Sequence, residues 1–157
     1  MSSVTITFPK SRLAKLLRQP GGKSVSAALA DAEAALDLLA IPCAEALDVS
    51  LGAIDRLLAE FAAAPGAPTA NALYLDVKAI IGVATTARLP DMDHAAFSLC
   101  ELLDWMNNAG KWDVGAVVVH VQALHYLRQP AALAADTSVR AVLMGLKRVR
   151  EKIIANA

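Results

Sequence analysis

The sequence has little of what marks several common protein classes. Phe, Trp and Tyr make up only 4% of the 157 residues, while Ala and Leu are abundant, and this balance favours helices over a sheet. No apolar run approaches the roughly 18 residues typical of a transmembrane helix. The opening MSSVTITFPK lacks the charged-then-apolar order of a signal peptide. The expected location is therefore the cytoplasm, without membrane attachment.

Charge and cysteine content exclude further kinds of site. The 15 basic and 15 acidic side chains cancel, so no overall field attracts nucleic acid or an anionic membrane. Cys43 and Cys100 lie far apart in apolar helical patterns, without a second cysteine nearby to begin a metal site. Both are expected to be buried thiols, and the sequence predicts neither a metal nor a cofactor.

Helical periodicity is the main positive signal. Between residues 25 and 64, large apolar residues recur every three or four positions, interrupted by Pro42. An interior proline costs about 3 kcal/mol, so we expect either two helices meeting at Pro42 or one kinked helix. Further helices are expected at about 70–88, 91–107, 113–128 and 137–155.

The pattern predicts an all-α fold. Short connections force successive helices to run antiparallel, which describes an up-down helical bundle. We expect residues 1–24 to be a lead-in segment, with Ser24 or Ser26 capping the helix that follows it. Residues 25–157 are expected to form a single bundle domain.

Two stripes of residues run along the helix expected at 70–88. One stripe is apolar and should face the core: Leu73, Val77, Ile80, Ala84 and Ala87. The other should face outward, at least in part, and is called the Lys78 face: Tyr74, Lys78, Ile81, Gly82 and Thr85. A mid-helix glycine costs about 1 kcal/mol relative to alanine, which suggests a packing or docking reason. An arginine at Gly82 should therefore leave folding intact but weaken docking.

The run LYLDVKAIIGVATTARLPDMDHAAFSLCELLD, from Leu73 to Asp104, resembles the histidine-containing phosphotransfer (Hpt) domain. The family pattern has a histidine, two residues, a lysine and a glycine, followed by a proline and SLC. Gly82, Pro90 and Ser98–Cys100 match it, and HVQAL at 120–124 extends the similarity to about residues 70–128. The resemblance implies an Hpt-like four-helix bundle with additional flanking helices.

The chain departs from the family at the positions that carry the chemistry. Lys78 stands where the family has its phosphorylated histidine, and Ile81 stands where it has the lysine. A lysine amine with an ordinary pKa of about 10.4 is protonated at neutral pH and has no lone pair to accept a phosphoryl group. The resemblance thus implies a non-catalytic module, not an enzyme. Its Lys78 face would bind a receiver domain or a histidine kinase.

Three alternatives stay open. Another histidine, such as His120, could carry the phosphoryl group, although a histidine among apolar neighbours is more often hydrogen-bonded within a bundle. His94 lies beside carboxylates that repel phosphate, and His120 and His125 are five residues apart, which does not suit a one-face metal pair. The chain could also be a scaffold or homo-oligomer, or Lys78 a solvated surface lysine.

Overall fold

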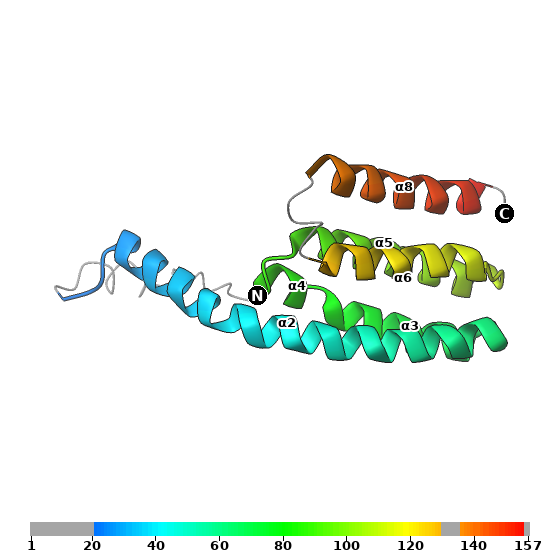
Figure 1. Cartoon of the computed structure of the whole chain (residues 1–157), viewed down its shortest axis with the longest axis horizontal. Coiled ribbons are helices and arrows are strands. Elements are labelled where there is room, and N and C mark those ends of the chain that lie inside the picture. Colours follow the sequence, from blue (N-terminus) through cyan, green and yellow to red (C-terminus); the bar gives the residue numbers. More distant parts are fainter. Residues whose placement is uncertain (1–20, 130–135, 156–157) are drawn as a thin grey trace, which may run out of the picture. The chain divides into compact units, whose positions relative to one another are not determined.

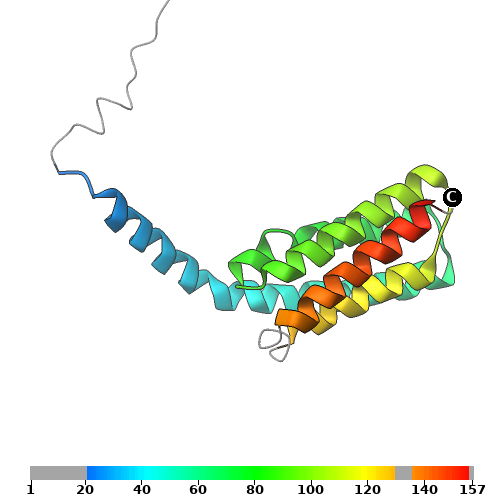
Figure 2. The ribbon, with the colours of Figure 1, turned by 90° about the horizontal axis from the view of Figure 1, so that it is seen from above.

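The computed structural model describes residues 21–129 and 136–155, and these residues form helices without any strand. The helices are α2 (Val25–Ala63), α3 (Ala67–Ile80), α4 (Val83–Thr86), α5 (Pro90–Ala109), α6 (Val114–Arg128) and α8 (Asp136–Ala155) (Figure 1). Successive long helices run in alternating directions (Figures 1 and 2). The predicted all-α, up-down helical bundle is confirmed. Among the described residues, no helix has both the length and the apolar content needed to cross a membrane.

The chain divides into two compact units, Met1–Ala35 and Leu36–Ala157. The sequence pattern instead placed the boundary after residue 24, and residues 1–20 of that predicted lead-in lie outside the described residues. In the first unit, Ser24 Oγ accepts a hydrogen bond from the Ala27 amide at 3.2 Å, which confirms Ser24 as the N-cap of α2. Every described residue from 21 to 35 is exposed.

Pro42 does not divide α2, which continues through it as one helix. From Leu47 onward the helix contributes to the core of the second unit through Leu47, Leu51, Ile54 and Phe61. Two exposed contacts tie this part of α2 to α6: Arg128 pairs with Asp48 at 2.8 Å and His125 with Asp55 at 2.8 Å. Cys43, expected to be buried, is only half-buried, because it precedes the segment of α2 that enters the core.

The central helix is α5, which packs against α3, α4, α6 and α8. Pro90 stands at its first turn, where a missing amide proton costs nothing. Gly110 ends it in the left-handed conformation (φ 63°), with its amide bonded to the Met106 carbonyl at 2.9 Å. α8, orange to red in Figure 2, packs on both α5 and α6. Most of α5 is buried: Met92, Ala95, Ala96, Ser98, Leu99, Cys100, Leu102, Leu103 and Met106.

The prediction of one helix over 70–88 is wrong. α3 ends at Ile80, Ile81 is extended, Gly82 has a φ of 86°, and α4 begins at Val83. The carboxylate of Asp93 holds this break, since it accepts hydrogen bonds from the amides of Gly82 (3.0 Å) and Thr85 (3.1 Å). Most of the expected core stripe is nevertheless buried, namely Leu73, Val77, Ile80 and Ala84, with Ala87 half-buried.

The positive φ reverses the expectation for Gly82→Arg. An L-residue forced into such a conformation costs about 1 to 3 kcal/mol, so the variant should melt roughly 2 to 10 °C below wild type. The matched control is Ala79→Arg, an exposed position inside α3 where arginine is compatible with the helix. Thermal melting of both variants checks this, and equal melting temperatures would show that Gly82 is not needed for the turn.

Candidate docking site

Three residues of the predicted Lys78 face line one hollow on the surface. Tyr74, Lys78 and Ile81 enclose it together with Phe97 and Cys100 from α5, and its volume is about 330 Å³. Ile81 lies just beyond the end of α3 but still contributes to the hollow. This group of five residues is called the Lys78 hollow. The two positions at which the chain departs from the Hpt pattern therefore lie together in space.

Gly82 and Thr85 are not among the residues that line the hollow. Both belong to the turn that Asp93 holds, and the Thr85 hydroxyl also bonds to the Asp93 carboxylate. Their place in the sequence suggested an outward stripe of a continuous helix, but the helix is broken between them and Lys78. Gly82 therefore has a backbone reason to be glycine that is independent of docking.

Phe97 is the residue of the hollow that the sequence pattern did not single out. Its side chain is 56% exposed on α5, between buried Ala96 and buried Ser98. Phe97 brings an exposed aromatic ring to the hollow, and aromatic residues are enriched in protein interfaces. Together with Ile81, which is 38% exposed, it makes the rim of the Lys78 hollow apolar.

The electrostatics of the hollow come from Lys78 and Cys100. Burial raises the pKa of the Cys100 thiol to about 11, although the positive charge of Lys78 acts in the opposite direction. The thiol is therefore protonated at neutral pH, and it does not supply a thiolate nucleophile. Lys78 lies exposed in the last turn of α3, where a cation is favoured by the helix dipole. The hollow thus presents one ammonium group within apolar surroundings.

His120 is fully buried between α5 and α6. Its Nδ1 donates to the Ala116 carbonyl at 2.8 Å, so its Nε2, 3.2 Å from Ser98 Oγ, accepts from that hydroxyl in the neutral ring. Burial lowers the pKa of His120, partly opposed by the hydrogen bond to Ala116. Both ring nitrogens are occupied and the side chain is 0% exposed, so a phosphorylated partner cannot reach it in this fold.

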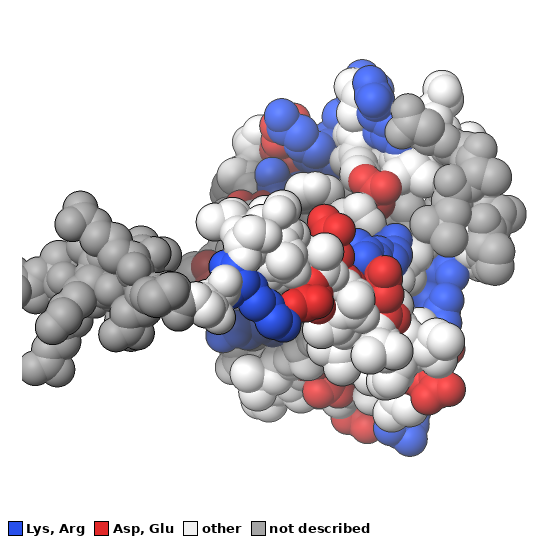
Figure 3. Space-filling model, turned by 90° about the vertical axis from the view of Figure 1, so that its left-hand side faces the viewer, with Lys and Arg blue, Asp and Glu red and all other residues white. Residues whose placement is uncertain are grey.

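The two remaining histidines lie apart from the Lys78 hollow lining. His125 bonds to Asp55, and His94 is exposed in the first turn of α5. Among residues 21–129 and 136–155, no three His, Cys, Asp or Glu side chains lie close enough to hold a metal ion. In Figure 3 basic and acidic side chains are interspersed on the face shown, without a large area of either sign.

No protein-family model matches the chain, and comparison with characterised proteins and with solved structures gave no match either. The resemblance to the Hpt family therefore stays a prediction from the matched residues: Gly82, Pro90, Ser98, Leu99, Cys100 and the run from His120 to Leu124.

The lowered pKa of His120 makes stability depend on pH. The unfolded ring, with a pKa near 6.5, takes up a proton that the buried ring refuses, so the folded state loses stability as pH falls below 6.5. This loss amounts to at most about 1.4 kcal/mol per pH unit, and it is absent above pH 7.5. We expect His120→Gln, which cannot titrate, to show a weaker loss between pH 7.5 and 5.5. Urea unfolding at a series of pH values measures this, and parallel losses in the two proteins would contradict it.

Proposed function

We propose that this chain is a non-catalytic signalling module, similar to the Hpt domain, that binds a receiver domain or a histidine kinase through the Lys78 hollow. It acts by occupying the partner and transfers no phosphoryl group. The observation that carries this proposal is the position of Lys78, an exposed ammonium group inside an apolar hollow at the place of the family's phosphorylated histidine.

Charge and shape make a receiver domain a suitable partner. The phosphorylation site of a receiver is an acidic pocket, and an Hpt domain normally presents its histidine to that pocket. Lys78 would present a positive charge instead, which favours encounter with carboxylates and persists without any phosphoryl group. Phe97 and Tyr74 supply the kind of aromatic contact that contributes strongly to protein interfaces.

The same residues argue against chemistry. Phosphotransfer to a histidine needs an unprotonated ring nitrogen and a nearby cation that neutralises the phosphate oxygens. Lys78 has no ring nitrogen that could accept the phosphoryl group, and Ile81 has no charge that could neutralise the phosphate oxygens. The Cys100 thiol, with its raised pKa, is no substitute nucleophile. His120, the alternative carrier, is enclosed between helices.

Charge reversal at Lys78 tests the docking. Binding is measured with purified receiver domains and histidine kinases of the source organism. Lys78→Glu should weaken the affinity of this chain for its partner by about 10-fold or more, since like charges across an interface repel. The control is Lys147→Glu, which reverses an exposed charge on α8 far along the chain. Calorimetric titration gives the affinities.

Equal losses in the two variants, or no binding to any receiver or kinase, would contradict the proposed partner. Light scattering on the same proteins distinguishes the dimer alternative. If Lys78→Glu converts a dimer into a monomer, the hollow joins two copies of this chain, and the receiver proposal is wrong.

A second test concerns phosphotransfer. Incubation with a receiver that carries ³²P on its aspartate should leave the wild-type chain unlabelled, because Lys78 and Ile81 replace the histidine and the lysine of the family pattern. Lys78→His combined with Ile81→Lys restores both family residues within one hollow, and weak, acid-labile labelling of that double variant is expected. Acid-labile label on the wild-type protein would overturn the non-catalytic assignment.

A further inference from the structure

The apolar stripe of α2 extends beyond the part of the helix that enters the core. From Leu47 onward the stripe is buried, but α2 begins at Val25. Val25 is 76% exposed, Leu29 is 61% exposed and Leu39 is 50% exposed. Apolar side chains in water gain free energy when a partner covers them. This part of α2 therefore offers a surface that a partner can bury.

The exposed stripe has the spacing of a coiled coil. Its steps along the chain alternate between four and three residues, so each residue recurs after seven. In a coiled coil the residues with this spacing form the seam along which one helix packs on another. The stripe is therefore suited to a partner that is itself a helix. It is called the α2 seam and consists of Val25, Leu29, Ala32, Leu36, Leu39 and Cys43.

The α2 seam is complementary to itself when two copies run in opposite directions. With Ala34 at the centre of the pair, every seam residue of one copy lies opposite a seam residue of the other. The facing residues are Val25 and Cys43, Leu29 and Leu39, and Ala32 and Leu36. Near the centre a small residue thus faces a large one, which lets the two helices interdigitate. A surface that matches its own copy in this way suits a two-fold symmetric dimer.

The order of charges along the chain also favours opposite directions. Residues 1–24 contain five basic side chains and no acidic one, whereas residues 25–55 contain six acidic side chains and no basic one. In a parallel pair the two acidic blocks would lie side by side and repel. In the opposite direction, Glu45 and Asp48 come to the end of the other helix that begins after Lys23. Lys23 also pairs with Asp31 of its own helix, so the attraction comes from the net charge of the blocks and not from a free lysine.

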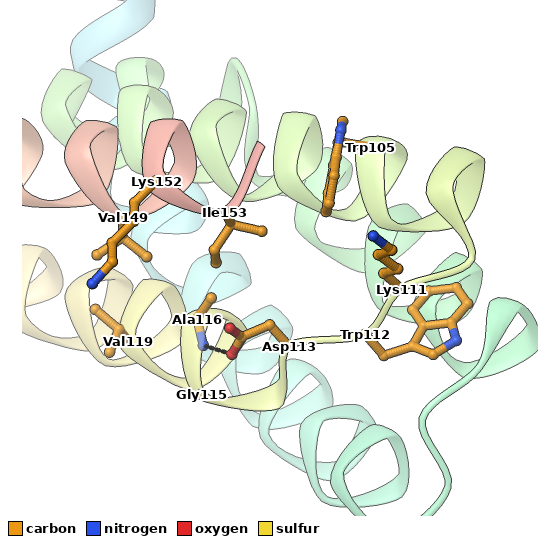
Figure 4. Close-up of a pocket in the computed structure, with 10 residues that line it drawn as sticks. All are labelled: Trp105, Lys111, Trp112, Asp113, Gly115, Ala116, Val119, Val149, Lys152 and Ile153. Atoms are coloured by element: carbon orange, nitrogen blue, oxygen red, sulfur yellow. Dashed lines mark hydrogen bonds between the residues drawn. The ribbon is translucent and has the colours of Figure 1, made fainter. Parts of the chain in front are cut away.

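The space between α6 and α8 is another apolar surface to which a second α2 could bind. Two neighbouring recesses of about 460 and 370 Å³ lie there and are together called the α6–α8 groove. Charges of both signs line the larger recess, with Asp113 between Lys111 and Lys152 in Figure 4, so charge does not select the acidic α2 there. Both the reciprocal register and the order of charges favour pairing of α2 with itself. The groove lining includes Trp105, Gly115, Val119, Gly145 and Val149.

We propose that two copies of this chain associate through their α2 seams, which pack side by side in opposite directions. The pair covers the seam and leaves Leu38, on the opposite side of the helix, in water. No residue of α2 lines the Lys78 hollow, so this dimer does not depend on the proposed docking function. Lys78→Glu should accordingly leave the dimer intact.

Two leucines on opposite sides of α2 provide a variant and its matched control. Leu29→Glu places a charge in the seam and removes two buried leucines from each dimer, so it should weaken dimerisation by at least about 100-fold. Leu38→Glu makes the same chemical change at a residue that is 79% exposed, and it should change the dissociation constant by less than about 2-fold. Sedimentation equilibrium at a series of concentrations gives the constants. Because both leucines are exposed in the single chain and glutamate is also a good helix former, circular dichroism should show equal helix content.

Cross-linking determines the direction of the pair. Val25→Cys brings a thiol opposite Cys43 of the second copy, and a short bismaleimide should then join the two copies. In the wild-type dimer the two Cys43 thiols would lie about 27 Å apart, at 1.5 Å for each residue along the helix. The wild-type protein should therefore stay unlinked. Buried Cys100 is present in both proteins, so the comparison controls for it.

Four outcomes would overturn the proposal. A wild-type chain that stays monomeric up to about 1 mM would show that the seam does not pair. Equal weakening by Leu29→Glu and Leu38→Glu would show that the seam does not control association. Cross-linking of the wild-type protein through Cys43 would show a parallel pair. If Gly145→Leu, which adds a large side chain in the α6–α8 groove, weakens the dimer as much as Leu29→Glu, the second α2 lies in that groove instead.

Discussion

The burial of α5 is the constraint on which the rest of the second unit depends. This helix packs against α3, α4, α6 and α8, and it supplies a large share of the fully buried side chains. Its sequence alternates small residues, such as Ala95 and Ala96, with Leu and Met, so that helices can approach it from several sides. Because it lies in the middle, it also contributes to both recesses: Phe97 and Cys100 line the Lys78 hollow, and Trp105 lines the α6–α8 groove.

The Asp93 carboxylate stabilises the turn that follows Ile81 at the edge of the Lys78 hollow. By binding the amides of Gly82 and Thr85, Asp93 stabilises a turn that a continuous helix would not contain. The break places Lys78 in the last turn of α3 and lets Ile81 face the same hollow from an extended residue. In an unbroken helix, Ile81 and Gly82 would continue the stripe that begins with Tyr74 and Lys78. The positive φ at Gly82 is therefore linked to the geometry of the candidate site, even though Gly82 does not line it.

The parts of the fold that periodicity predicts are those that depend on local pattern. The helix positions, the burial of Leu73 and Val77 and the cap at Ser24 follow from residue spacing and side-chain chemistry. The break at Gly82 was not predictable in the same way, because its stabilising partner Asp93 is 11 residues away and belongs to the next long helix. Phe97 and the α6–α8 groove depend on which helices lie side by side, and one sequence with small residues at Gly115 and Gly145 does not reveal that arrangement.

The proposed function depends on where the His120 imidazole and the Lys78 ammonium group lie. His120 is kept neutral and enclosed, where it holds α5 to α6 through Ser98, while the exposed hollow carries a permanent positive charge on Lys78. A phosphorylated histidine would make binding depend on the phosphorylation state of the module itself. A lysine at position 78 removes that dependence. On the proposed function, the duration of a signal would then follow from the dissociation rate of the complex and from any change in the partner, because the Lys78 hollow carries no phosphoryl group that could be added or removed.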